Sequence, residues 1–202
     1  MDKALFMSAC REGGIAIERA LREIDRAFFA VLYRSSLRSL RDPELARDLV
    51  QETFIKVWQR CATFRGDSDL LPWIKAILRH AVIERLRRTV RETPMENEQG
   101  LTGEASRHIA DLSAKDNPTP ERIAHQRERA EQFREGWMRF QKAHPLHASV
   151  MAWVVEDGLS IDDIADLLGR TPGATREFVS QCRKRARLYL ADWYKMATEA
   201  AE

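Results

Sequence analysis

Apolar residues recur with the period of an α-helix along most of this chain, and no segment alternates apolar and polar residues convincingly with a period of two. A first helix is predicted over residues 15–40, where Ile17, Ile24 and Phe28 fall near one face. Asp42-Pro43 then reads as an N-cap followed by proline at the first position of a second helix, whose apolar residues, Trp58 among them, are expected to face inward. The pattern therefore predicts an all-α fold.

An acidic segment divides the helical pattern into two parts. Residues 92–119 contain few large apolar side chains, and residues 92–121 hold seven acidic residues against two basic ones. Such a segment buries too little surface to offset the entropy lost on ordering, so we expect a flexible linker. The prediction is two small helical domains, 1–91 and 120–202, joined by residues 92–119.

The net charge of +2 conceals two basic segments. Residues 73–91 carry six basic side chains and one acidic one, and residues 170–190 have the same balance. Two basic segments separated by an acidic spacer indicate a polyanionic partner that is contacted at two places.

Residues 161–187 are predicted to form a short helix, a tight turn and a basic helix. Ser160 and Asp163 fit an N-cap with an acid at the third helical position, and Gly169 suits a left-handed turn. This arrangement is typical of a helix-turn-helix, whose second helix enters the major groove, although a hairpin of helices with a solvated basic face is the alternative. The candidate DNA contacts are Thr171, Gly173, Arg176, Ser180, Arg183 and Lys184.

Residues 45–58 have the sequence Leu-Ala-Arg-Asp-Leu-Val-Gln-Glu-Thr-Phe-Ile-Lys-Val-Trp. This segment resembles the polymerase-binding helix of the extracytoplasmic-function sigma factors of bacterial RNA polymerase. Phe-Arg-Gly-Asp-Ser at 64–68 is similar to the loop with which that family captures a flipped base of the −10 element. Residues 73–80 and 86–88 resemble the helix that reads and melts this element, and residues 158–169 resemble the start of the −35-reading domain. The order of the four pieces makes the resemblance specific.

The resemblance implies a non-catalytic subunit that directs polymerase to promoters. Its implied partners are core RNA polymerase, through the clamp coiled coil and the flap, promoter DNA, and a dedicated regulator such as an anti-sigma factor. The implied polymerase-binding residues are Glu44, Asp48, Gln51 and Glu52. The implied −10 contacts are Phe64, Arg65, Asp67, Ser68, Arg79, His80, Arg87 and Arg88, with Phe64 also a candidate for the core.

Several residues depart from the family's usual pattern. Arg47 stands where an acid is usual, His80 where asparagine is usual, and Glu84 where aspartate is usual. The last helix also differs, so its −35 sequence is not carried over from the family. The residues that differ there are Ala174, Thr175, Glu177 and Phe178.

The remaining features favour no other chemistry. Cys10, Cys61 and Cys182 lack the spacing of a disulfide framework, which fits a cytoplasmic protein, and no apolar segment is long enough for a bilayer. His144 and His147 have no cysteine or carboxylate set nearby, so we expect no metal site and no cofactor. No catalytic constellation stands out.

Two alternatives remain open: a dimeric helix-turn-helix regulator, and a sigma-like interaction protein in which Arg47 weakens polymerase binding.

Overall fold

The computed structural model describes residues 2–92 and 120–199, and within these ranges every regular element is helical, as predicted. The linker predicted for 92–119 lies outside the described residues, except for its first residue, which ends a helix. None of the described helices combines the length and apolar character that crossing a bilayer requires. The elements are α1 (Lys3–Glu12), α2 (Gly14–Leu40), α3 (Pro43–Arg60), the 3-10 turn η1 (Cys61–Thr63), α4 (Leu70–Glu92), α5 (Pro120–Ala143), α6 (Pro145–Val155), α7 (Ile161–Leu168), α8 (Pro172–Tyr189) and α9 (Ala191–Glu199).

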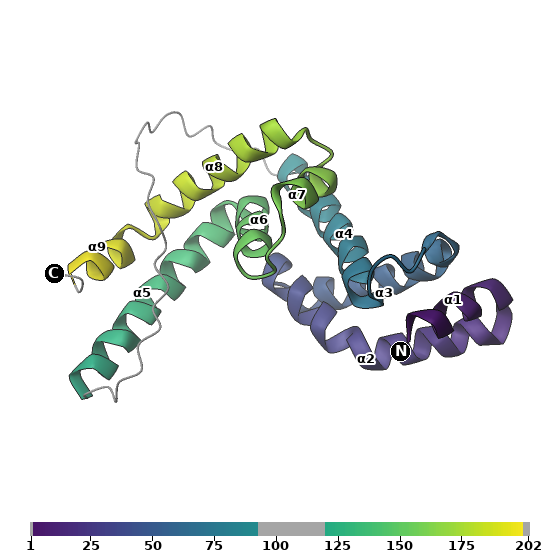
Figure 1. The fold of residues 1–202 in the computed structure, drawn as a ribbon. Coiled ribbons are helices and arrows are strands. Elements are labelled where there is room, and N and C mark those ends of the chain that lie inside the picture. Colours follow the sequence, from purple (N-terminus) through teal and green to yellow (C-terminus); the bar gives the residue numbers. More distant parts are fainter. Residues whose placement is uncertain (1, 93–119, 200–202) are drawn as a thin grey trace.

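The helices form two groups that meet along α4. Figure 1 shows α1 to α4 together on one side, α5, α8 and α9 extending on the other, and α6 and α7 between them. α4 packs against α2 and α3 and also against α6 and α7. One cluster of buried side chains therefore contains Leu32 and Leu78 from the first group together with Trp153 and Ile164 from the second.

The helix α1 was not predicted from the sequence. It runs back along α2, and the connection uses Gly13 and Gly14, whose φ angles of 71° and 50° suit glycine because it has no Cβ. Phe6 on α1 is fully buried, and its ring centroid lies 5.8 Å from that of Phe64 and 6.1 Å from that of Trp73. α1 thus completes an aromatic core beneath the loop that follows α3.

The predicted helix ends are confirmed by their hydrogen bonds. Asp42 Oδ1 accepts from the backbone N–H groups of Glu44 and Leu45 at 2.9 and 3.0 Å, which fixes the start of α3. Ser160 and Asp163 form a reciprocal capping box at the start of α7, and Gly169 ends that helix with φ 64°. These local signals are strong because each one satisfies backbone groups that the helix leaves unpaired.

Gly136 allows α5 to approach α8 closely. A Cβ at this position would lie 2.4 Å from the carbonyl oxygen of Tyr189, a backbone atom that cannot move without shifting α8.

We expect Gly136→Ala to lower the free energy of unfolding by about 1–3 kcal/mol, despite the better helix propensity of alanine. Urea denaturation measures this difference. Gly173→Ala on α8 is the matched control, because nothing lies within 4 Å of the added Cβ. Equal stability of the two variants would contradict the close approach.

Candidate nucleic-acid and partner interface

The solvent face of α3 carries an acidic stripe. Glu44, Asp48, Gln51 and Glu52 are all exposed, while Ala46, Leu49, Val50, Thr53 and Val57 bury the opposite side of the helix. The Oε1 atom of Glu52 lies 2.7 Å from Nζ of Lys56 on the same helix. The spacing thus places the four residues on one accessible surface, as the sequence pattern predicted.

The same face continues as an apolar surface that sequence reasoning missed. Ile55 and Trp58 are each 54% exposed, and the expectation that Trp58 points inward is wrong. Steps of three or four residues from Asp48 lead through Gln51 to Ile55 and Trp58, so helical phase could have identified the stripe. The expectation failed because an aromatic side chain was assigned to the core by its type rather than by its phase. We name the surface formed by residues 44, 48, 51, 52, 55 and 58 the α3 face.

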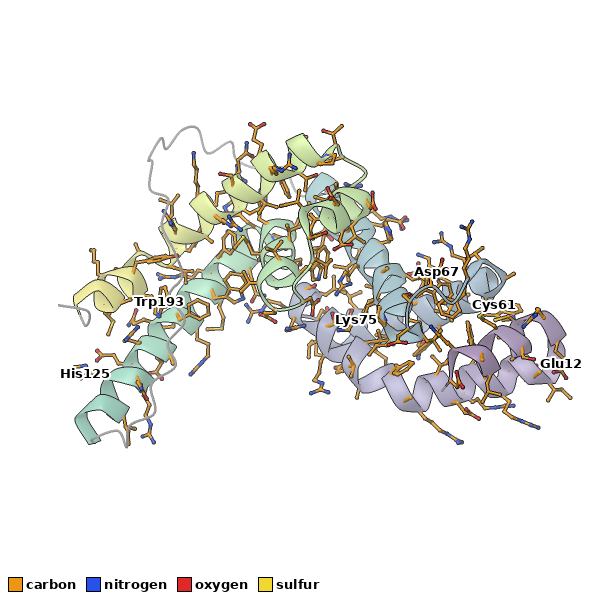
Figure 2. All side chains as sticks on the ribbon, in the orientation of Figure 1. Glu12, Cys61, Asp67, Lys75, His125 and Trp193 are labelled. Carbon is orange, nitrogen blue, oxygen red and sulfur yellow. The ribbon has the colours of Figure 1, made fainter. Side chains whose placement is uncertain are left out.

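The loop after η1 separates one buried residue from three exposed ones. Phe64 is only 6% exposed and packs on Trp73 at a centroid distance of 5.0 Å, so its ring belongs to the core and is not positioned to stack on a base here. Arg65, Asp67 and Ser68 are exposed, and Figure 2 labels Asp67 on this loop. The loop therefore presents a polar edge supported by aromatic rings from below.

The basic side chains of α4 have varied surroundings. Nη2 of Arg79 donates to Oδ2 of Asp157 at 2.7 Å, and the Arg79 residue is 8% exposed. Nη2 of Arg87 donates to the carbonyl oxygen of Leu168 at 3.0 Å, although the Arg87 residue is exposed. Arg88 is exposed and pairs with Glu84 one turn earlier. Of these three arginines, Arg79 is therefore the one that is withdrawn from solvent.

His80 lies on the exposed side of α4. Partial burial of its ring, and then the charge of Arg60, lower the pKa of His80 below its usual value. It is therefore neutral near pH 7 and can contribute hydrogen bonds but no full charge. His80, Arg87 and Arg88 also line a cavity of about 510 Å³ between α4 and Leu167 of α7.

The helices α7 and α8 pack as a helix-turn-helix predicts. Three residues of α7 and two of α8 are buried where the helices pack: Ile164, Ala165, Leu168, Val179 and Cys182. The candidate DNA contacts on the other side, Thr171, Gly173, Arg176, Ser180, Arg183 and Lys184, are all exposed. The structure thus places these six residues at the N-cap and along the accessible side of α8.

Two of the unusual residues of α8 belong to its packed side. Phe178 is 8% exposed, with the Arg170 guanidinium 4.4 Å from its ring centroid and the His147 ring at 5.0 Å. Thr175 is fully buried, and its hydroxyl donates to the carbonyl oxygen of Thr171 at 2.9 Å. Ala174 and Glu177 are exposed. The departures at 175 and 178 therefore concern packing, whereas those at 174 and 177 lie on the accessible surface.

His144 and His147 are engaged with residues of α8. Nε2 of His147 lies 3.0 Å from Nη1 of Arg185, and Nε2 of His144 lies 3.3 Å from the Tyr189 hydroxyl oxygen. Burial, and then the charge of Arg185, lower the pKa of His147 to about 4. The described residues contain no cluster of three or more histidine, cysteine or acidic side chains arranged to hold a metal ion.

The comparisons with known proteins all match RNA polymerase sigma factors. Residues 18–92 match the family model described as sigma-70 region 2. The chain is 28% identical over 153 residues to a probable RNA polymerase sigma factor, RfaY, of Xanthomonas campestris, covering 75% of this chain but 36% of that longer protein. It is 24% identical over 180 residues to the ECF RNA polymerase sigma-E factor of Haemophilus influenzae, covering 83% of this chain and 89% of the relative.

The fold is also similar to a solved structure. The sigma factor RpoE from Bartonella quintana, crystallised with the anti-sigma factor NepR, superposes with a TM-score of 0.51 at 19% identity. The match covers 86% of this chain and 98% of that one. It therefore extends over both helical groups and not over the N-terminal group alone.

The lowered pKa of His147 predicts a pH dependence of stability. The unfolded chain protonates this residue near pH 6.5, but the folded chain does so only near pH 4, so protonation progressively favours unfolding as the pH falls between these values. We expect His147→Gln to lose less stability than the parent over this window, as measured by urea denaturation at several pH values. The exposed His125 provides the control, and His125→Gln should follow the parent. Parallel curves for His147→Gln and the parent would contradict the burial of a neutral imidazole.

Proposed function

Because this chain belongs to the extracytoplasmic-function family of RNA polymerase sigma factors, we propose that it binds core polymerase through the α3 face and recognises promoters with α4 and α8. The single observation that carries this assignment of surfaces is the α3 face itself. An operator-binding regulator needs a reading helix but has no need for an acidic and apolar surface on a separate helix. We further propose that the protein acts in the cytoplasm, has no catalytic activity of its own, and is divided at residues 92–119 as the sequence predicts.

The α3 face has the composition of a protein-binding surface. Its acidic half, at Asp48 and Glu52, complements basic groups on a partner, which supports orientation and association rate. Its apolar half, at Ile55 and Trp58, supplies a large aromatic group of the kind that contributes most to binding when it is desolvated. The clamp coiled coil of the polymerase is the partner that the family membership implies.

We assign the −10 element to α4 and to the loop before it. The exposed polar edge at Arg65, Asp67 and Ser68 can hydrogen-bond to an unstacked base, while Phe64 holds the loop in place from the core. Arg87 and Arg88 lie along the same helix and supply phosphate contacts. His80 is neutral near pH 7 and offers a hydrogen bond where the family usually has asparagine.

We assign the −35 element to α8. Arg176, Ser180 and Arg183 are exposed on this helix, and the side-chain oxygen of Thr171 accepts from the backbone N–H of Ala174 at its start. Thr171 thereby caps the start of α8, and the basic side chains of Arg176 and Arg183 follow in later turns, where they can contact phosphate and base edges. Residues 174 and 177 are also accessible, so the base preference at this element is expected to be this chain's own.

Regulation is expected to come from a dedicated protein. The solved relative is a complex with an anti-sigma factor, and we propose a regulator of that kind for this chain. Run-off transcription with purified core polymerase on genomic fragments tests the function as a whole. Binding to operator DNA without any effect on polymerase would instead favour a conventional regulator.

Reversing the charge of the α3 face tests polymerase binding. Asp48→Arg combined with Glu52→Arg should weaken core binding by several kcal/mol, because both new charges would face basic groups of the partner. Fluorescence titration with labelled protein measures the affinity. The matched control is Glu131→Arg combined with Glu135→Arg on α5, two exposed acids with the same spacing. If both double variants bind core polymerase equally well, the α3 face is not the interface.

Removing Arg176 tests sequence reading by α8. Arg176→Ala should cost roughly 1–3 kcal/mol on the best promoter and relax the preference at one −35 position, because an arginine at a base edge is specific. Arg88→Ala should instead weaken all promoters similarly and reduce the salt dependence. Transcription from a promoter library randomised at both elements separates the two patterns. A uniform loss for Arg176→Ala would mean that this residue only contacts phosphate.

A further inference from the structure

We propose that Lys3 of α1 is a positioning residue for the loop at 64–68, which it holds in the conformation that receives an unstacked base. We name residues 64–68 the capture loop. The inference rests on the proposed function of this loop in −10 recognition. It adds a helix that lies outside residues 18–92, the part of the chain that matches the region 2 model.

Two side chains of α1 meet the capture loop at Gly66. Nζ of Lys3 donates to the carbonyl oxygen of Gly66 at 2.9 Å. The φ angle of Gly66 is 79°, a left-handed value that other residues rarely adopt, and a Cβ built there would lie 2.9 Å from Sδ of Met7. α1 therefore holds the backbone of this turn by a hydrogen bond and packs a thioether against the same residue.

The helix that carries these side chains is itself fixed in place. Figure 1 shows α1 lying along α2, next to the end of α3. Lys3 and Met7 are four residues apart and lie on the same side of α1, while Phe6 is fully buried in the aromatic core beneath the loop. The carboxylate of Asp2 caps the first turn by accepting from the backbone N–H two residues later at 2.9 Å. α1 is thus an anchored support from which Lys3 reaches the loop.

The exposed part of the capture loop has few other restraints. Arg65, Asp67 and Ser68 are exposed. Among the residues that the structure describes, Lys3 is the one whose hydrogen bond ties positions 65–68 to a separate helix. Without this bond the loop samples more conformations, and the entropy of ordering it lowers the affinity for a base. We therefore expect Lys3 to strengthen base capture without contacting the base itself.

A direct phosphate contact is the competing role for Lys3, because the residue is exposed and cationic. Loss of a phosphate contact weakens all promoters similarly and lowers the salt dependence of binding. Loss of a positioning contact instead changes the preference at the −10 position that the loop reads. The hydrogen bond to Gly66 favours positioning, because it directs the ammonium group toward the loop backbone.

The closing experiment compares Lys3→Met with Arg11→Met in the full chain bound to core polymerase. Both substitutions remove one positive charge from α1, but the hydrogen bond of Arg11 stays within this helix, at the carbonyl oxygen of Met7. Run-off transcription from promoters randomised at the −10 element reports base preference, and fluorescence titration reports core affinity. Lys3→Arg retains a donor at the same position, and Asp67→Ala tests the loop itself.

Lys3→Met should lower transcription from the preferred promoter about fivefold, the factor that one hydrogen bond typically contributes, and should relax the preference at one −10 position. Its core affinity and salt dependence should equal those of Arg11→Met. Lys3→Arg should keep most of the activity and the preference of the parent.

Three results would overturn the proposal. The first is equal transcription and equal −10 preference for Lys3→Met and Arg11→Met. The second is a uniform loss on all promoters with a smaller salt dependence, which would make Lys3 a phosphate contact. The third is a loss of core affinity as large as the loss of transcription, because Lys3 would then only support the fold.

Asp67→Ala separates a failure of this inference from a failure of the proposed function. A changed −10 preference for Asp67→Ala with an unchanged one for Lys3→Met would leave the capture loop as the reader and remove only the positioning role. An unchanged −10 preference in both variants would overturn the positioning role together with the assignment of this loop to the −10 element.

Discussion

The burial of α4 on more than one side is the constraint from which the arrangement of the other helices follows. Three consecutive residues, Ala81, Val82 and Ile83, are each at most 3% exposed. Successive helical residues point about 100° apart, so no single neighbouring helix can cover all three. The N-terminal helices α2 and α3 cover part of this surface, and α6 and α7 cover another part. The hydrophobic demand of one helix thus brings the two halves of the chain together.

This demand also determines the charge pattern around α4. A helix enclosed in this way carries Arg79 into a poorly hydrated region, where an unpaired guanidinium would be costly. The carboxylate of Asp157 offsets that cost, since it is nearly as buried as the arginine it contacts. The small net charge of the chain is therefore a sum of opposite charges, some of which are already paired inside the fold.

Features encoded by neighbouring residues were predictable, and features that depend on distant ones were not. The ends of α3 and α7 follow from Asp42, Ser160 and Gly169, because caps act within a few residues. The position of Trp58 was predicted wrongly because the residue was assigned to the core by its aromatic type, although its helical phase places it with Asp48 and Ile55 on the solvent face. The pairing of Arg79 with Asp157 joins residues 78 positions apart, and no local pattern indicates such a contact.

The helix α8 separates its packing residues from its accessible residues by position. Thr175, Phe178, Val179 and Cys182 are buried against neighbouring helices, while the residues between them face solvent. Substitutions on the solvent side leave the core untouched and so carry little cost in stability. The base preference of this helix can consequently diverge between lineages while its packing is preserved, and duplicated copies of such a chain could acquire separate target sequences through a few surface changes.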